Sequence, residues 1–212
     1  MLRKVFWEDP YLTSQETRIA AVSGDDVTLE ETILYAFSGG QESDHGTIGG
    51  HEVLSARKAG ADILYTLPPA HGLQAGDPVT VAIDWERRYR LMRLHFAAEI
   101  VLELVYRDLG PIEKIGAHIA ADKARIDFAR EISIAPELPE LTTRAAAIIA
   151  ADLPITSAFS DETAGRRYWQ VPGFDPVPCG GTHLRRTGEV GSLSLRRRNI
   201  GKGKERVEIF LT

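Results

Sequence analysis

The spacing of apolar residues changes near residue 84, and this change constrains the fold more than any other feature of the chain. Before it, short apolar stretches alternate with Gly and Asp turn signals, which is typical of short strands in a small barrel or sandwich. The predicted strands are residues 18–23, 27–29, 33–37, 62–67 and 78–83. After it, apolar residues recur three and four apart, which predicts a helix over residues 84–107.

The remainder of the chain combines strands with a second helix. Alternating residues at 114–120 and 124–128 predict a hairpin, and residues 137–153 predict a helix that Pro154 ends. Two final strands, 191–198 and 206–211, flank a Gly-rich turn. The sequence therefore predicts an α+β protein with two domains. Residues 1–88 would form a small β-barrel-like domain, and residues 89–212 an α/β sandwich.

Composition excludes several classes of protein. With 43% hydrophobic and 26% charged residues, the 212-residue chain is ordinary for a globular protein. A net charge of -5 gives no overall sign of a nucleic-acid binder, so binding of that kind would need a local basic patch. Cys179 is the single cysteine, which excludes an intrachain disulfide and fits a reducing compartment. Because the start lacks a signal-peptide pattern and no apolar run reaches membrane-helix length, we expect a cytoplasmic protein.

Two pairs of residues carry groups that bind zinc. His95 and Glu99 lie four apart on the predicted helix and would project from one face, beside its apolar stripe. Cys179 and His183 flank Gly180-Gly181-Thr182, where the glycines let the backbone turn sharply. Taken singly, the first pair also fits a buried His–Glu hydrogen bond or a solvated helix edge, and the second a turn with a buried thiol. Together they supply four donors for a tetrahedral Zn2+ site.

Three segments resemble a known family. Residues 179–191, CGGTHLRRTGEVG, are similar to the C-terminal motif of the alanyl-tRNA synthetase editing domain. Residues 29–35 and 38–48, LEETILY and SGGQESDHGTI, are similar to its N-terminal motif, and Arg93-Leu94-His95 begins the helix motif. The order and spacing resemble the free-standing AlaX-type proteins along nearly the whole chain. No aminoacylation domain fits in 212 residues, so the resemblance is to the trans-editing form.

The resemblance implies hydrolysis of the ester bond of mischarged tRNA(Ala), charged with serine or glycine and chiefly with serine. It implies that His95, Cys179 and His183 bind zinc. It implies that Thr32 and Gln41 form a catalytic amino-acid pocket, whose hydroxyl and amide can bond a seryl hydroxyl. Without the resemblance, these two residues fit an ordinary strand and an ordinary turn. Backbone N–H groups of residues 180–182 (Gly180, Gly181 and Thr182) are expected to bind the substrate and hold the developing oxyanion.

Glu99 departs from the family, which usually has His at this position, and Ser38 replaces a usual glycine. Glu99 could be a fourth ligand, which would neutralise the dication and weaken it as a Lewis acid. It could instead be a general base. It could also mark lost activity, and the chain would then be a non-catalytic zinc-stabilised tRNA-binding module. Hydrolysis of another small ester is a further alternative.

Basic residues gather in the last part of the chain. Residues 185–206 hold eight basic residues and two acids. Basic clusters suit the phosphates of an acceptor stem, although a solubilising surface would look the same. The predicted tRNA-binding residues are Arg185, Arg186, Arg196, Arg197, Arg198 and Lys202. A second basic group, residues 87–93, opens the predicted helix. The sequence leaves open whether the protein is a monomer or a homodimer.

Overall fold

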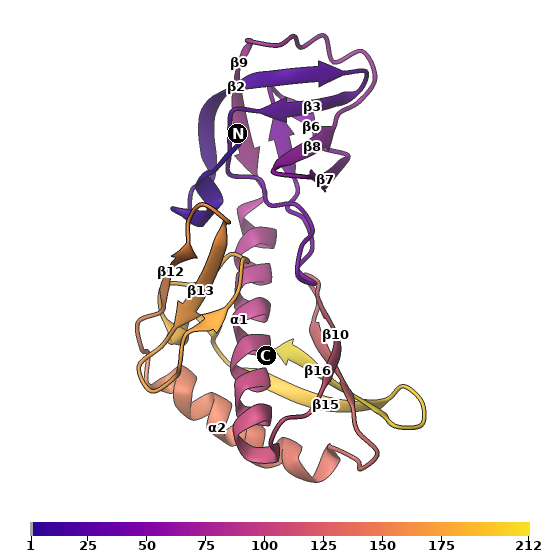
Figure 1. Ribbon diagram of the computed structural model, residues 1–212, viewed down its shortest axis with the longest axis vertical. Helices are drawn as coiled ribbons and strands as arrows, with labels where there is room; N and C mark the ends of the chain where they lie inside the picture. Colours follow the sequence, from indigo (N-terminus) through magenta and orange to yellow (C-terminus); the bar gives the residue numbers. More distant parts are fainter. Residues whose placement is uncertain (1) are drawn as a thin grey trace. The chain divides into compact units, whose positions relative to one another are not determined.

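The computed structural model describes residues 2–212, and the chain divides into two compact units (Figure 1). The first unit holds the residues up to 38 together with 42–89. The second holds 39–41 together with 90–212. Both strands and helices are present, so the predicted mixture of α and β structure is confirmed.

A seven-stranded antiparallel sheet forms most of the first unit, in the order β6-β5-β9-β2-β3-β8-β7. Its central strand β2 pairs with β9 through its first half and with β3 through its second half, with a bulge between Ile19 and Ala21. A long strand that changes partner at a bulge makes the sheet curl on itself. The strands of this sheet are β2 Ser14–Ser23, β3 Asp26–Leu29, β5 Gly46–Ile48, β6 His51–Glu52, β7 Ser55–Ala59, β8 Asp62–Thr66 and β9 Pro78–Ile83. The unit also contains a parallel pair of short strands, β1 Arg3–Lys4 and β4 Glu31–Thr32, and a 3-10 turn, η1 Val5–Trp7.

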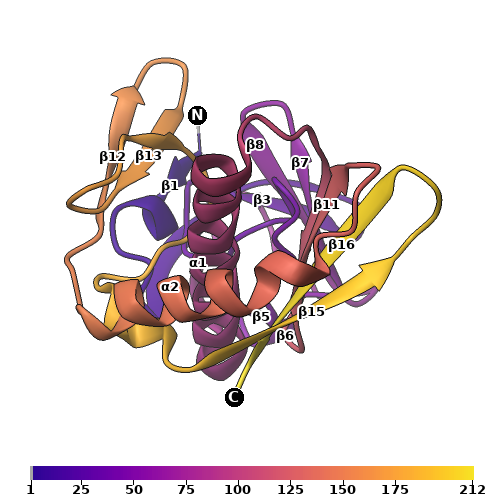
Figure 2. The same cartoon turned by 90° about the horizontal axis from the view of Figure 1, so that it is seen from below.

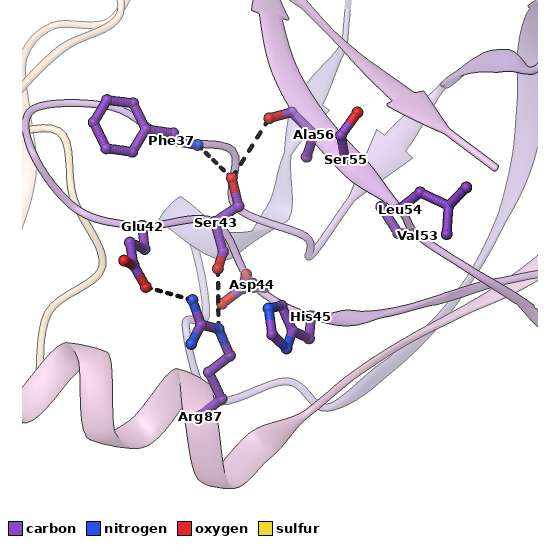
Figure 3. A pocket seen from close by; sticks show the side chains of 10 residues that line it. All are labelled: Phe37, Glu42, Ser43, Asp44, His45, Val53, Leu54, Ser55, Ala56 and Arg87. Carbon is purple, nitrogen blue, oxygen red and sulfur yellow. Dashed lines mark hydrogen bonds and ion pairs between the residues drawn. The ribbon is translucent and has the colours of Figure 1, made fainter. Parts of the chain in front are cut away.

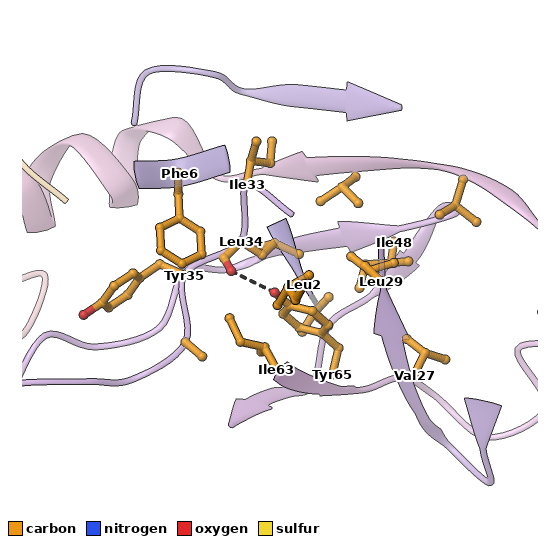
Figure 4. Packing of buried hydrophobic residues seen from close by; sticks show 14 of the residues in the cluster. Leu2, Phe6, Val27, Leu29, Ile33, Leu34, Tyr35, Ile48, Ile63 and Tyr65 are labelled. Atoms are coloured by element: carbon orange, nitrogen blue, oxygen red, sulfur yellow. Dashed lines mark hydrogen bonds between the residues drawn. The ribbon is translucent and has the colours of Figure 1, made fainter. Parts of the chain in front are cut away.

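The apolar core of this unit surrounds a segment that we predicted as a strand, residues 33–37 (Figure 4). That prediction is wrong, because residues 33–36 are buried, Phe37 is exposed, and none of the five forms part of a strand. Side chains satisfy their backbone instead. The Tyr65 hydroxyl donates to the Leu34 carbonyl at 2.8 Å, and the Tyr35 N–H donates to Asp44 at 2.7 Å. An apolar run alone cannot distinguish this arrangement from a buried strand.

Arg88 completes the same arrangement from the start of the helix. Its guanidinium pairs with both oxygens of Asp44 and donates to the carbonyls of Ile33 and Pro10 at 2.5 and 2.9 Å. Both charged side chains are 0% exposed. Within the basic group at residues 87–93, Arg88 is therefore enclosed in the first unit and not available to a phosphate.

The second unit contains two sheets and most of the long helix α1, Trp85–Leu109. Strands β10 Lys114–Ile119, β11 Ala124–Ala129, β16 Lys204–Leu211 and β15 Leu193–Asn199 form a four-stranded antiparallel sheet in that order. Strands β12 Thr156–Asp161, β13 Arg166–Gln170 and β14 Val177–Pro178 form a smaller one. Helix α2, Leu138–Ala150, packs against β15 and against the 3-10 turn η3, Thr187–Val190 (Figure 2), and a further 3-10 turn, η2 Ala135–Glu137, precedes it.

Helix α1 is buried on more sides than its predicted single stripe requires. Leu91, Met92, Phe96 and Ala97, which point in different directions around the helix, are each 0% exposed. The middle of this helix is therefore buried on several sides, as is typical of a core position. Gly110, with φ of 79°, follows its last residue. Among residues 2–212, none of the helices is both long and apolar enough to cross a membrane.

Candidate metal centre

Three side chains of the second unit converge on one point. His95 projects from α1, while Cys179 and His183 lie in the loop after β14. One ligand atom from each lies within 4.8 Å of the others. The Sγ atom of Cys179 is 3.4 Å from His95 Nε2 and 3.2 Å from His183 Nε2, and both histidines are buried.

These distances can be compared with a zinc tetrahedron. Zn–N bonds of about 2.0–2.1 Å and Zn–S bonds of about 2.3 Å place neighbouring ligand atoms roughly 3.5 Å apart. The two N···S separations of 3.4 and 3.2 Å are close to that edge length. The donor set of two imidazoles and one thiolate is also the type that zinc prefers. The residues therefore fit a zinc ion.

Glu99 lies beside two of these residues, His95 and Cys179. Its Oε1 atom is 3.3 Å from His95 Nε2 and 3.7 Å from Cys179 Sγ. Its Oε2 atom accepts a hydrogen bond from Trp169 Nε1 at 3.1 Å. One oxygen is thus fixed by the indole while the other faces the donors. The structure brings His95, Cys179 and His183 together as one group and places Glu99 next to two of them; its role as a fourth ligand stays a prediction.

Each imidazole has a polar partner on its second nitrogen. His95 Nδ1 lies 2.7 Å from Gln41 Oε1, and His183 Nδ1 lies 2.8 Å from Ser157 Oγ. Gln41 Nε2 in turn donates to Thr182 Oγ1 at 2.9 Å, and both of these side chains are fully buried. Metal-binding histidines typically have such a partner, which fixes the ring orientation and the tautomer. Gln41 and Thr182, predicted to contact substrate, here contact each other, and Gln41 also contacts His95.

The two glycines between Cys179 and His183 have different surroundings. A Cβ atom on Gly181 would overlap His95 Cε1 and lie 2.6 Å from His95 Nδ1, whereas one on Gly180 would meet no atom within 4 Å. Position 181 therefore requires glycine, because the backbone passes directly against the ring of His95. Position 180 borders open space, where a ligand could approach the backbone.

The electrostatics of the centre favour a bound cation. Burial acts to lower the pKa of His95, but the Cys179 sulfur and then Glu99 raise it to about 10. Burial acts to raise the pKa of Glu99, but the hydrogen bond and charge of His95 lower it to about 2. Burial and the charge of His95 lower the pKa of His183 to about 3. A metal ion would take the place of the proton on His95.

Two residues of the centre were missed in the sequence, Ser157 on β12 and Trp169 on β13. Trp169 is 1% exposed and packs edge-on against Phe96, with ring centroids 5.0 Å apart. Strand β13 also positions the thiol, because the Cys179 N–H donates to the Arg167 carbonyl at 2.9 Å. In the fold, buried Arg167 and Trp169 alternate with half-buried or exposed neighbours, but the sequence shows no clear apolar alternation here because Arg167 is charged.

We expect Trp169→Phe to lower zinc affinity by roughly 10- to 100-fold, the usual effect of removing a group that orients a ligand. Phenylalanine keeps the ring packed on Phe96 but cannot donate to Glu99. Competition with a zinc chelator measures the affinity, and Phe174→Leu, which alters a neighbouring ring without touching Glu99, is the control. Equal affinities for Trp169→Phe and the unmodified protein would mean that the indole does not orient Glu99.

Thr32 lies in the first unit and is fully buried. Its hydroxyl is 2.9 Å from the Tyr65 hydroxyl and accepts from the Leu34 N–H at 3.1 Å. The hydroxyl therefore has protein partners, and its predicted contact with substrate stays a prediction.

The predicted tRNA-binding residues differ in their partners. Arg186 pairs with Asp152 at 2.7 Å, and Arg198 pairs with Glu208 at 3.7 Å. Arg197 pairs with Glu205 through two hydrogen bonds of 2.7 and 2.5 Å. Arg196 lies over the ring of Phe210 at 5.0 Å, and Lys202 and Arg185 are exposed. The local excess of positive charge is thus smaller in the fold than in the sequence.

Comparison with known proteins gives consistent matches. Residues 167–208 match the family described as threonyl and alanyl tRNA synthetase second additional domain. The whole chain is 31% identical to the alanyl-tRNA editing protein AlaX-M of Pyrococcus horikoshii, covering 98% of that protein. Over 98% of the chain it is 31% identical to AlaX-M of Saccharolobus solfataricus, again covering 98% of the relative. Over 97% of the chain it is 32% identical to the alanine–tRNA ligase of Ignicoccus hospitalis, covering 25% of that enzyme.

Proposed function

Since the chain belongs to the family of alanyl-tRNA editing proteins of the AlaX-M type, we propose that it is a zinc-dependent trans-editing hydrolase that deacylates mischarged tRNA(Ala), chiefly Ser-tRNA(Ala). The observation that carries this proposal is the convergence of His95, Cys179 and His183 at zinc-like spacing in a chain similar to editing proteins along its whole length. We propose residues 1–88 as an N-terminal domain and 89–212 as the zinc-binding editing domain. Because mischarged tRNA(Ala) arises where tRNA is aminoacylated for translation, we propose a cytoplasmic location.

We propose that Glu99 is the fourth ligand. Its Oε1 separations of 3.3 and 3.7 Å from the neighbouring donors are near the roughly 3.5 Å expected of ligands that share one zinc ion. The bond from Trp169 holds the carboxylate in that orientation. A general base would instead need space for a water molecule between its oxygen and the other donors. When bound, zinc supplies a Lewis acid that polarises a carbonyl and lowers the pKa of water.

The remaining site residues are proposed to position the aminoacyl ester. Gln41 orients His95, and position 180 borders open space on the side of the N–H groups of residues 180–182, which are proposed to hold the ester carbonyl. The Thr182 N–H now donates to Gln41 Oε1 at 3.3 Å and would have to exchange that partner for the substrate. Thr32 and Gln41 are proposed to recognise the serine hydroxyl. Because Tyr65 and Thr182 now occupy their polar groups, recognition requires exchanging one of those partners for the substrate.

For tRNA binding, Arg196 and Lys202 are the sharpest candidates. We expect Arg196→Ala and Lys202→Ala each to weaken tRNA(Ala) binding. Each change should also reduce the number of counterions released on binding, measured as the slope of log K against log salt concentration, by about one, because one phosphate contact is lost. Titration of tRNA(Ala) at several salt concentrations measures both effects, and Lys114→Ala is the charge-matched control. Unchanged binding and salt slope would remove the two residues from the interface. Arg197→Ala is a poorer probe, because it also leaves buried Glu205 without its cation.

One observation favours a second candidate function, a non-catalytic zinc-stabilised tRNA-binding module. Four donors from the protein would fill a tetrahedral zinc site, and filled sites are typical of structural zinc, whereas catalytic sites keep an open position. In that case, the protein would bind mischarged tRNA(Ala) without cleaving its ester.

Deacylation of Ser-tRNA(Ala), with metal content measured on the same sample, tests the proposal. We expect the zinc-loaded protein to release serine, to leave Ala-tRNA(Ala) intact, and to lose activity when a chelator removes the metal. Circular dichroism establishes that the metal-free protein is still folded. Undiminished hydrolysis by folded, metal-free protein would refute the role of zinc. Zinc-loaded protein that binds Ser-tRNA(Ala) but leaves the ester intact would support the non-catalytic module.

A further inference from the structure

The four-stranded sheet of the second unit has an outer face, formed by the side chains that point away from the core. Successive side chains of a strand point to opposite faces of a sheet. In β16, Val207 and Ile209 are fully buried in the core, so Arg206, Glu208 and Phe210 lie on the outer face.

The register of the neighbouring strands assigns further charged residues to this face, because residues directly opposite in an antiparallel pair share a face. Among the described residues of β11, β15 and β16, five cations and two acids lie on the outer face. The cations are Arg125, Arg196, Arg198, Lys204 and Arg206. The acids are Asp127 and Glu208. Positive charge is therefore in excess on this surface.

The first acid, Asp127, is bound by two arginines. Arg206 donates to both of its oxygens at 2.6 and 2.9 Å, and Arg125 donates to Oδ2. Asp127 is buried, whereas the side chains of both arginines are partly exposed. One cation would be enough to pair this carboxylate, so one positive charge is left over.

The second acid, Glu208, repeats this arrangement. Lys123, in the turn before β11, donates to it at 2.8 Å, and Arg198 lies 3.7 Å away. The hydrogen bond from Lys123 lowers the pKa of Glu208 against the effect of burial, and the charges of Arg198 and Arg206 lower it further. Glu208 is buried, whereas the Arg198 side chain is 62% exposed, so the acid lies beneath its cations.

Two cations of the outer face lie directly opposite each other. Arg198 of β15 and Arg206 of β16 form a cross-strand pair, and like charges in such a pair are destabilising. On the wall of a cavity in the first unit, by contrast, Glu42 offsets the charge of Arg87 at 2.6 Å (Figure 3). A surplus of like charge that weakens a sheet is typical of a surface that binds a partner of opposite charge.

The layout of the cations indicates the kind of anion. Neighbouring strands lie about 4.8 Å apart, and alternate residues of one strand are about 7 Å apart, so the cations are spread over the sheet in two directions. This spread fits a repeated anionic chain better than a single ion. Guanidinium groups bind phosphate through two parallel hydrogen bonds, and Arg196 is held over the ring of Phe210. The phosphate backbone of a nucleic acid has the matching charge and repeat.

The sheet also adjoins the metal centre within the second unit. Gln41, which contacts His95, forms a bridge with Ile119 at the end of β10. Ile119 lies opposite Ala124, the residue before Arg125. The cations of β11 therefore begin close in the fold to the residues that surround the metal site.

We propose that the outer face binds the phosphate backbone of the double-stranded acceptor stem of tRNA. The inference rests on the proposed function, because tRNA is the partner given there. It adds Arg125 and Lys123, which lie outside the basic segment of the sequence, to the interface. It removes Arg197, which points to the other face of the sheet and binds Glu205.

Binding of an uncharged minihelix that copies the acceptor stem of tRNA(Ala) tests the proposal without any hydrolysis. Because each acid keeps its second cation, Arg125→Gln and Arg198→Gln remove positive charge without leaving a buried carboxylate unpaired. We expect the double variant to bind more weakly and to lower the slope of log K against log salt concentration by about two, one for each lost phosphate contact. Arg125→Lys with Arg198→Lys should keep the slope, because the charge is retained.

The matched control removes two cations from exposed ion pairs elsewhere, with Arg57→Gln and Arg144→Gln, and should keep the slope of the unmodified protein. Circular dichroism establishes that all variants are folded. Equal slopes for the unmodified protein and the Arg125→Gln, Arg198→Gln variant would overturn the proposal, and so would an equal reduction in the control.

Vesicles that contain anionic lipid test the other large polyanion that this face could meet. If the double variant lost binding to the vesicles while its binding to the minihelix was unchanged, the face would belong to a membrane surface and the proposal would be wrong. Failure of the unmodified protein to deacylate Ser-tRNA(Ala) would refute the proposed activity but not this surface, provided that the salt slope still depends on Arg125 and Arg198.

Discussion

Replacing Cys179 by alanine is expected to lower zinc affinity by more than about 100-fold and to abolish zinc-dependent deacylation, because even loss of a group that merely orients a ligand costs about 10- to 100-fold. The sulfur lies 3.2 and 3.4 Å from the two imidazoles and is the one thiol in the chain. Alanine removes a zinc–sulfur bond and a negative charge that offsets the dication. Zinc bound after dialysis against a chelator, together with calorimetric titration, measures the loss.

The control must show that zinc leaves this site and not a surface histidine. His51 and His71 form a second pair in the first unit, with ring centroids 6.2 Å apart. We expect His51→Ala to keep one tightly bound zinc and full activity. Stoichiometric zinc in Cys179→Ala, at unchanged affinity, would contradict the assignment. A folded Cys179→Ala protein that lost zinc but still deacylated Ser-tRNA(Ala) would support the assignment of the metal site and exclude a catalytic role for the metal.

Features encoded within a few residues could be predicted from the sequence. The i, i+4 spacing of His95 and Glu99 depends only on helical geometry, and the period of apolar residues located α1 within two residues at each end. Residues 114–120 and 124–128 do form the hairpin β10–β11, because strand alternation and a short turn are also local signals. The strands around Trp169 lacked a strong alternation and were not assigned.

Features that depend on distant contacts could not be predicted in this way. The bonds from Gln41 and Trp169 to residues of α1 join positions 54 and 70 apart, and no local pattern specifies them. Arg186 appeared to be an uncompensated cation, yet Asp152 lies 34 residues before it in the sequence. Segment 33–37 has the composition of a strand, but side chains from other segments bind its backbone. The sequence therefore predicts which groups belong to the site, and the fold determines how they are oriented.

The second large effect is on stability. We expect Asp44→Asn to lower the free energy of unfolding by about 3–5 kcal/mol, the usual cost of removing one partner of a buried ion pair. Arg88 would remain 0% exposed without a counter-ion, and the Tyr35 N–H would lose the strength of a bond to a carboxylate. Chemical denaturation measures the change, and hydrogen exchange at Tyr35 should report opening of residues 33–36 first.

Two comparisons separate this ion pair from ordinary surface charge. Asp161 and Arg166 form an exposed pair, with side chains 35% and 71% exposed, so Asp161→Asn should cost less than about 1 kcal/mol. Adding Arg88→Met to Asp44→Asn should recover part of the loss, because no unpaired charge then remains buried. Recovery stays incomplete, since Arg88 also donates to the carbonyl of Ile33. Equal costs for Asp44→Asn and Asp161→Asn would mean that the buried pair does not hold this segment in place.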